Sequence, residues 1–490
     1  MPLDPRSPVL VGLHQLEQRV DDPLEGQEPL EMMVRAAEGA AQDAGSHRLL
    51  ENADVVCVSR GRWQYDDPGR ALATRFGAPQ AQSALAPFGG NMVQSAVNRF
   101  ARDIAENRRD IAVLVGAEHG RSQSRAQKQG IQLAYSEAPG QPDFQTTPDM
   151  PMVHEAEIAR GTVQPVVMYP IFENAIRHAR GESIEAHRQR VSRIWAGFNA
   201  VAVDNPHAWI REPLDAEKIG TPSETNRMVG FPYPKLMTAN DKVDQAAALI
   251  LCSVEAAQRW GVPREKWVFL HAGTDAHDHP LVSNRIDLHS SPAIRLAGGR
   301  ALELAKCSAE EIDRVDLYSC FPSAVQVAAQ ELGLSEDRPL TVTGGLTFGG
   351  GPLNNYTMHG IARMGEVLRQ DPGSRGLCTA NGGYLTKHAF GVYGSEPPEA
   401  GFHWESPQAA VDQLPRREAV VDHEGEATLE SYTVRYKAGA PTRAHAAFLL
   451  ADGRRTWANS EDRELAEEMT RNEFCGRAAR IDGAGSFSVQ

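Results

Sequence analysis

The segment GGNMVQSAVNRFARDIAEN at residues 89–107 has a counterpart far along the chain, GGPLNNYTMHGIARMGEVLRQ at residues 350–370. Each copy begins with a glycine pair and continues with apolar residues at helical spacing. Each is followed by an apolar segment of the length of a buried strand, IAVLVGAE at 111–118 and GLCTANGG at 376–383. We therefore predict that one glycine–helix–strand unit occurs twice in the chain.

The repeat extends upstream of both glycine pairs. Each copy is predicted to form a helix, a strand and a second helix, at residues 29–45, 53–61 and 69–77 in the first copy and 292–308, 315–320 and 325–333 in the second. A repeat of so long a period indicates two similar α/β domains packed about a pseudo-twofold axis. A reactive centre is expected where the two glycine-rich helix starts meet.

The composition is that of a globular protein with more than one domain. The chain has 490 residues, and 41% of them are hydrophobic, which is enough to fill two or three cores. A formal charge of −14 argues against a general nucleic-acid or anionic-membrane surface. Five basic residues either form a local basic pocket for a phosphorylated cofactor or are solvated surface charges: Arg60, Arg62, Arg121, Arg125 and Lys128.

Six cysteines are scattered without CxxC spacing, and the sequence has no signal-like or membrane-length apolar segment. We therefore expect a reduced, cytoplasmic protein. Cys57 and Cys252 lie in apolar segments and are expected to be buried core thiols. Cys320 and Cys378 are expected at strand ends, at the sheet edge where open α/β folds bind ligands. No metal site is expected, because HAGTDAHDH at 271–279 is interpreted as a strand-end loop.

The pattern divides the chain into four predicted parts. They are an α/β half at 1–120, an inserted loop domain at 121–240, a second α/β half at 241–403 and a C-terminal β-domain at 415–490. The second half is predicted to open with a helix over 241–261, whose apolar face packs on the sheet. The β-domain is predicted from alternating apolar and polar residues on both sides of a hairpin turn at Asp452-Gly453.

The double repeat resembles the thiolase superfamily, closest to its sterol-carrier-type branch, and with the β-domain the whole resembles the thiolase-like proteins of type 1. The segments that carry the likeness are NAVAVDNPHAW (199–209), PYPKLMTANDKVDQAAALIL (232–251), VDLYSCFPSAV (315–325) and TVTGGLTFGGGP (341–352). The resemblance implies a duplicated five-layer αβαβα sandwich with a small antiparallel β-barrel domain. It also implies coenzyme A or an acyl-CoA as the ligand, with no permanently bound cofactor.

Thiolases use a nucleophilic cysteine at the first glycine-rich helix start and a histidine in a GHP motif. The resemblance places the cysteine position at Gly89 and the histidine position at Gly351, so neither reactive group is present. Ordinary thiolase turnover is not expected without a thiolate and its base. The backbone N–H groups of Gly89–Gly90 and Gly350–Gly351 could still hold an oxyanion, or these glycines only permit tight helix packing.

Five side chains near these positions are candidate catalytic residues: Tyr318, Cys320, Tyr356, His359 and Cys378. By the resemblance, YSCF at 318–321 replaces the family's HDCF motif, and Cys378 approximates its final cysteine. Tyr318, Tyr356 or His359 could move the proton of a β-hydroxyl, which needs no cysteine. The family's aldolases of steroid side-chain breakdown use tyrosines near these motifs and require a partner with a small β-barrel domain. As core or capping residues, Tyr356 and His359 would need no reactivity.

Three classes of function are open at this point. The first is an acyl-CoA enzyme of fatty-acid or related lipid metabolism, either a divergent acyltransferase or a β-hydroxyacyl-CoA retro-aldolase. The second is a non-catalytic acyl-CoA-binding protein. The third is a scaffold subunit that pairs with an active thiolase-like partner or a small β-barrel partner. The chain itself is expected to be a monomer or a homodimer.

Overall fold

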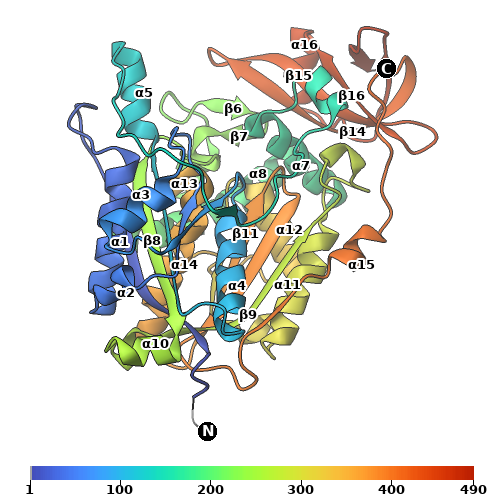
Figure 1. Cartoon of the computed structure of the whole chain (residues 1–490). Coiled ribbons are helices and arrows are strands. Elements are labelled where there is room, and N and C mark those ends of the chain that lie inside the picture. Colours follow the sequence, from blue (N-terminus) through green and yellow to red (C-terminus); the bar gives the residue numbers. More distant parts are fainter. Residues whose placement is uncertain (1–2, 490) are drawn as a thin grey trace.

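The computed structural model describes residues 3–489, and both copies of the predicted helix–strand–helix unit are confirmed (Figure 1). The first half contains β1 (Pro8–Glu17), α1 (Pro29–Ala44), α2 (Arg48–Glu51), β2 (Val55–Ser59), α3 (Pro68–Arg75), β3 (Gln82–Ala86), α4 (Met92–Ala105) and β4 (Ile111–His119). The second half contains β9 (Val268–His277), η3 (Val282–Asn284), α11 (Pro292–Leu304), η4 (Ala309–Glu311), β10 (Arg314–Asp316), α12 (Pro322–Leu332), α13 (Gly345–Phe348), η5 (Leu353–Asn355), α14 (Tyr356–Gln370), β11 (Arg375–Gly382) and β12 (Lys387–Gly394).

The segment predicted as a helix over 241–261 is instead a strand followed by a short helix. Strand β8 (Asp244–Ser253) pairs antiparallel with both β1 and β4, and α10 (Val254–Arg259) and η2 (Arg264–Lys266) follow it. All ten residues of β8 are buried. A central strand covered on both faces has a continuous apolar sequence, so the run AAALIL gave no alternation by which to recognise it.

The strands form a continuous hydrogen-bonded path, β10-β11-β12-β9-β1-β8-β4-β2-β3-β5. In the first half, alternate residues of each strand enter different cores. Val56 and Val58 pack with α1 on one face, whereas Val55 and Cys57 pack with α4 and α14 on the other. Helices α4 and α14 also contact strands of the second half, while α11 and α12 cover its outer face. The result is the five-layer αβαβα sandwich.

Two further expectations for the second half are corrected by the strand positions. Residues 271–277 belong to β9 rather than to a loop, and only Asp278 and His279 follow the strand. Cys378 lies in the middle of β11, not at its end, and is buried in the core shared with α4 and α14. Cys57 and Cys252 are buried core thiols, as expected.

The inserted segment lies over the top of the sandwich in Figure 1. It contains α5 (Gly120–Gln129), β5 (Phe144–Gln145), α6 (Glu155–Ala159), α7 (Pro165–Ala179), α8 (Ile184–Asp204), α9 (Ala216–Gly220), β6 (Met228–Gly230), β7 (Tyr233–Pro234) and η1 (Lys235–Met237). Strand β5 pairs with β3 and so covers that edge of the sheet. Within residues 3–489 no helix is both long and apolar enough to cross a membrane.

The C-terminal part forms the predicted antiparallel β-domain, shown in red in Figure 1. Its elements are α15 (Gln408–Asp412), β14 (Gly425–Lys437), β15 (Ala440–Leu449), β16 (Arg455–Ser460), α16 (Arg463–Met469), β17 (Ala478–Ile481) and β18 (Phe487–Val489), preceded by the linker strand β13 (His403–Glu405). The predicted hairpin turn at Asp452-Gly453 joins β15 to β16. A bridge between Asn459 and Ser486 brings the two edge strands together. Contacts of β14 with α7 and β6 dock the domain on the inserted segment.

Candidate functional site

The two glycine pairs precede the two central helices, α4 and α14. Side chains at the start of α14 form hydrogen bonds with the backbone of the glycine pair before α4. The Asn354 Oδ1 atom accepts a hydrogen bond from the Gly89 N–H at 3.1 Å. The Thr357 hydroxyl donates to the Gly90 carbonyl at 2.8 Å. The helix starts that the sequence repeat paired therefore lie together in the core of the molecule, as the pseudo-twofold arrangement requires.

Only part of the backbone N–H groups at these starts is available to a ligand. The Gly89 N–H is used by Asn354, and the Gly351 N–H donates to the Asn240 carbonyl at 2.9 Å. Within residues 3–489, the N–H groups of Gly90 and Gly350 have no hydrogen-bond acceptor. An oxyanion at the first helix start would therefore be held by Gly90 rather than by Gly89.

The space above Gly90 is closed by two groups from the second half. A Cβ atom added to Gly90 would overlap the Tyr318 hydroxyl and the Asn381 carbonyl oxygen. Tyr318 reaches this position because it lies two residues after the end of β10 at Asp316. Asn381 reaches it because it is the second-last residue of β11, which ends at Gly382. Two neighbouring strands thus deliver a hydroxyl and a carbonyl to the start of α4.

Tyr318 is 8% exposed, and within the described part of the chain its hydroxyl has no hydrogen-bond partner. Its ring meets Tyr356 edge to face at 5.4 Å between centroids. Burial raises the pKa of the Tyr318 phenol above its ordinary value, with a smaller contribution from Cys320. Tyr318 is therefore a neutral hydrogen-bond donor at pH 7, and its hydroxyl is the free side-chain donor next to Gly90.

Tyr356 lies beside Tyr318, but its hydroxyl is already bonded. It donates to Asp316 Oδ2 at 3.1 Å and contacts the Thr343 hydroxyl at 2.7 Å. Asp316 in turn accepts hydrogen bonds from Thr341 Oγ1 at 2.8 Å and from the Val342 N–H at 3.0 Å. This fully buried network orients Tyr356 and thereby supports the Tyr318 ring.

Cys320, two residues after Tyr318, contacts Asn381 near the end of β11. Asn381 Nδ2 donates to the Cys320 sulfur at 3.8 Å and to the Tyr169 hydroxyl at 3.0 Å. Burial raises the pKa of the Cys320 thiol to about 12, so the group is a thiol and not a thiolate at pH 7.

We call the neighbouring groups Gly90, Tyr318, Cys320, Asn381 and Tyr169 the Tyr318 cluster. His359 and Cys378 do not belong to it. The His359 Nδ1 atom bonds Gln15 Oε1 on β1 at 3.0 Å, and burial lowers the pKa of its ring to about 3. Burial raises the pKa of the Cys378 thiol well above its ordinary value. Neither group has the position or the proton affinity of a base for chemistry at Gly90.

Arg121 and Arg125 lie together on α5, which projects at the upper left of Figure 1. Both form ion pairs with Asp21 at 3.3 Å, and that carboxylate is 93% exposed. The start of α5 packs against the 241–243 loop, whose neighbour Asn240 binds Gly351. The arginines are thus one short loop away from the second glycine pair.

Two residues of the cluster were not singled out from the sequence. Asn381 directly precedes the pair Gly382–Gly383, and a glycine pair at the end of a strand was a signal that could have identified it. Tyr169 comes from α7 in the inserted segment, and nothing in its sequence surroundings predicts that its hydroxyl meets Cys320 and Asn381.

The cluster can therefore donate hydrogen bonds but cannot supply a nucleophile. Its free donors are the Gly90 N–H and the neutral Tyr318 hydroxyl, and its one thiol is protonated at pH 7. Two free donors next to each other suit a carbonyl oxygen or the oxyanion derived from it.

Comparison with known proteins agrees with the fold and with the extra domain. The model of the thiolase-like protein type 1 additional C-terminal domain matches residues 407–486. The crystal structure of a monomeric SCP2-thiolase-like protein type 1 from Mycobacterium smegmatis superposes with a TM-score of 0.86 and 32% identity, covering 100% of this chain and 99% of that one.

More distant relatives share the αβαβα sandwich but match only about four fifths of this chain. The Ltp2-ChsH2(DUF35) aldolase gives a TM-score of 0.60 at 18% identity, and the dimeric peroxisomal thiolase of Saccharomyces cerevisiae gives 0.57 at 14%; each match covers 80% of this chain and 98% of the other. An acetyl-CoA acetyltransferase of Methanothermobacter thermautotrophicus is 27% identical over 192 residues. That alignment covers 36% of this chain and about half, 47%, of the relative.

Proposed function

The chain belongs to the SCP2-thiolase-like protein type 1 family, and on that premise we propose that it binds an acyl-CoA thioester at its paired glycine-rich helix starts without thiolase chemistry. The thioester carbonyl oxygen would accept hydrogen bonds from the Gly90 N–H and the Tyr318 hydroxyl. The pantetheine would run between the two halves toward the loop at Asn240, with Arg121 and Arg125 beyond it for the phosphates.

The observation that carries this proposal is the pair of unpartnered donors at Gly90 and Tyr318, next to a position that holds glycine instead of a nucleophile. Buried donors without acceptors are costly, so a ligand oxygen that pairs with both would contribute favourable binding energy. The relatives support the ligand class, since one is an acetyl-CoA acetyltransferase and another a thiolase by name.

Titration calorimetry with coenzyme A and acetyl-CoA tests this binding. We expect both to release or absorb heat and to raise the melting temperature, because a ligand of the native state stabilises it. Gly90→Ala should weaken acetyl-CoA binding by at least about tenfold, since its Cβ displaces Tyr318 and Asn381. Gly299→Ala in α11 is the matched control, because its Cβ would meet no atom within 4 Å.

A circular dichroism spectrum of each variant establishes that it is folded, and Tyr318→Phe removes the second donor without adding volume. Unchanged affinity in both Gly90→Ala and Tyr318→Phe would contradict the proposed site. The absence of any response to coenzyme A or its thioesters in the unmodified protein would contradict acyl-CoA binding itself and favour a scaffold role.

A second candidate function, aldol-type C–C bond formation or cleavage, is favoured by the free Tyr318 hydroxyl. In the forming direction, the α-carbon of the thioester loses a proton to solvent hydroxide, and Gly90 holds the resulting enolate. The enolate attacks an aldehyde or ketone, its electron pair becomes the new C–C bond, and Tyr318 donates its proton to the carbonyl oxygen of that aldehyde or ketone. The resulting phenolate is then reprotonated from solvent. Tyr356 and His359 are bonded elsewhere, so Tyr318 alone has this role. The aldolase among the structural relatives shares the fold.

If this second activity exists, Tyr318→Phe should lower the rate by roughly 10²- to 10⁴-fold, the usual contribution of a general acid. Substrate affinity should fall far less, by no more than about tenfold, because only one hydrogen bond to the ligand is lost and the ring and its packing remain. The rates of aldehyde or ketone release from β-hydroxyacyl-CoAs, with the calorimetric affinities, separate the two effects. Equal losses in rate and affinity, or no carbonyl product from any substrate, would make Tyr318 a binding residue only.

A further inference from the structure

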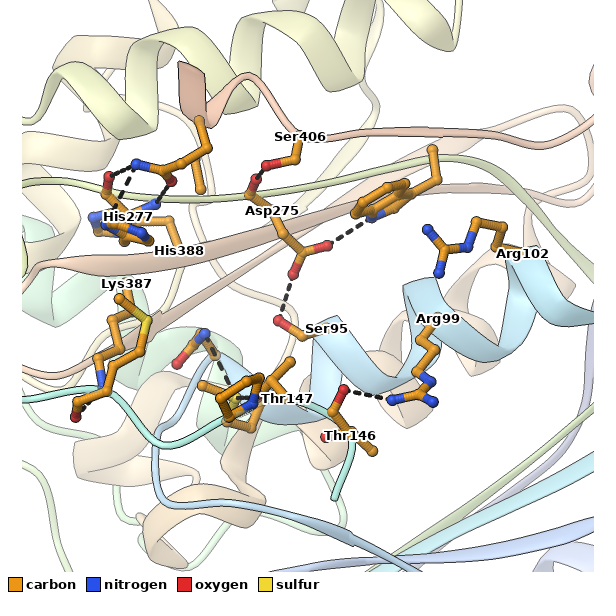
Figure 2. Close-up of a pocket in the computed structure, with 17 residues that line it drawn as sticks. Ser95, Arg99, Arg102, Thr146, Thr147, Asp275, His277, Lys387, His388 and Ser406 are labelled. Carbon is orange, nitrogen blue, oxygen red and sulfur yellow. Dashed lines mark hydrogen bonds between the residues drawn. The ribbon is translucent and has the colours of Figure 1, made fainter. Parts of the chain in front are cut away.

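A separate cavity of about 420 Å³ runs along the other side of α4 (Figure 2). Its floor is one stripe of that helix, formed by Asn91, Ser95, Arg99 and Arg102. The end of β9 and the start of β12 form a second wall. Residues 146–150 and the segment from β13 to the start of α15 form the rim. Met92, Met150 and Trp404 give the cavity mainly apolar walls.

Arg102 presents an unpaired cation at one end of this cavity. Its guanidinium stacks on the Trp404 ring at 4.5 Å and forms no ion pair or hydrogen bond within residues 3–489. Its Nε atom is buried without an acceptor. Arg99, one helical turn away, donates to the Thr146 carbonyl at 2.6 Å and keeps its charge at the same end. Figure 2 shows both arginines at the right-hand end of the cavity, with Arg102 on the upper side and Arg99 directed toward Thr146.

Lys387 presents a cation at the opposite end of the cavity in Figure 2. Lys387 is only 2% exposed. Its ammonium group makes a single long hydrogen bond, to the Met150 carbonyl at 3.3 Å. Burial lowers the pKa of Lys387 from its ordinary value, and Asp149 opposes this shift. Asn91 lies near this end, and its side-chain oxygen is buried with no donor.

The carboxylate in the cavity wall, Asp275, does not neutralise these cations. It accepts hydrogen bonds from Ser95, from Asn98 at 2.9 Å and from the Trp404 indole at 2.8 Å. Within the described residues it forms no ion pair with Arg102 or Lys387. Burial raises the pKa of Asp275, and the charge of Arg102 opposes this shift. The cavity therefore has a cation at each end and a largely apolar lining that also contains Asp275.

We propose that this cavity binds a medium-chain dicarboxylate, with one carboxylate at Arg99 and Arg102 and the other at Lys387. From Asn91 to Arg102 the helix advances about 16 Å, at about 1.5 Å per residue. Long side chains reach inward from both ends, so a chain of about eight carbons fits the remaining length. An apolar chain would cover Met92 and Trp404, and each carboxylate would pair with a cation that now lacks one.

Two kinds of ligand have this chemistry, a free dicarboxylic acid and the ω-carboxyacyl group of a CoA thioester. The second kind rests on the proposed function, because its thioester would occupy the site at Gly90. Asn91 and Met92, which line the cavity, directly follow Gly90 in the chain. The thioester would lie at Gly90 and the distal carboxylate at the arginines. Free suberate and suberyl-CoA are the probes that distinguish these two kinds.

Titration calorimetry of the full chain with suberate tests the proposal. Arg102→Gln and Lys387→Met should each weaken suberate binding about tenfold or more, since each removes a charge-assisted hydrogen bond. Octanoate, which lacks the second carboxylate, should bind more weakly than suberate and lose affinity in only one of the two variants. Arg471→Ala is the control, because this arginine is 73% exposed and lies in the C-terminal domain.

Binding of suberate alone would assign the free acid, and binding of suberyl-CoA alone, weakened by Arg102→Gln, would assign the acyl group. Gly90→Ala separates this inference from the proposed function, since it should weaken acetyl-CoA binding and leave suberate binding unchanged. The proposal is overturned if neither probe binds, or if Arg102→Gln and Lys387→Met retain the affinity of Arg471→Ala.

Discussion

Incubation of the protein with acetoacetyl-CoA and coenzyme A is expected to give no acetyl-CoA above the rate without protein. Thiolysis needs a thiolate that attacks the ketone carbon, and a base that forms this thiolate. Gly89 and Gly351 stand where the family resemblance places those groups. The nearby thiol, Cys320, has a pKa of about 12 and is protonated at pH 7. Loss of a catalytic nucleophile alone typically costs on the order of 10⁶ in rate.

Gly89→Cys is expected to leave thiolysis undetectable. Gly89 has φ of +149°, a conformation that side chains rarely adopt. An added Cβ would lie 2.7 Å from Asn91 Oδ1, so the new side chain would be strained. The base would still be missing. A coenzyme A-dependent rate above background in the unmodified protein would show that another residue supplies the nucleophile. Such a rate in Gly89→Cys alone would show that the introduced thiol reacts without the missing base.

The second large effect is expected for Arg455→Ala, which should release the C-terminal domain from the body of the protein. Arg455 is fully buried and forms a bidentate ion pair with Glu430 at 2.6 and 2.7 Å. It also donates to the carbonyls of Val282 at 3.2 Å, Ser283 at 3.0 Å and Arg285 at 2.6 Å. Breaking a buried ion pair from one side typically costs about 3–5 kcal/mol.

Hydrogen exchange measures this release directly. In Arg455→Ala, the amides of β14 to β16 should exchange roughly a hundredfold or more faster, since every 1.4 kcal/mol is a factor of ten. Arg454→Ala is the matched control, because Arg454 is 44% exposed and, within the part of the chain that the structure describes, forms an ion pair with Asp452 alone. Exposed pairs contribute at most about 1 kcal/mol. Similar exchange in the two variants would mean that Arg455 does not hold the domain in place.

The repeat predicted the helices and strands that carry the site, because glycine pairs and helical spacing are local signals. It failed at β8, where burial on both faces removed the alternation of a strand. It also placed Cys378 at a strand end, although the apolar residues around it continue into the core. In these cases the tertiary environment, which the sequence does not display, decided the outcome.

The sequence could predict which residues of the candidate site follow a strand or begin a helix. It could not predict the contacts between residues that are far apart in the sequence. Tyr318 was identified because it follows a strand beside a family motif. That its hydroxyl fills the space above Gly90 and has no acceptor depends on how the two halves pack. The same packing turns His359 toward Gln15, and brings Tyr169 of the inserted segment to Asn381.

The most direct test of acyl-CoA binding at the helix starts is a crystal structure of the protein soaked with acetyl-CoA. We expect an intact thioester whose carbonyl oxygen lies about 3 Å from the Gly90 nitrogen and the Tyr318 hydroxyl. No covalent bond should join the acetyl group to the protein. A pantetheine bound away from both glycine pairs, or an acetyl group attached to a side chain, would contradict this account.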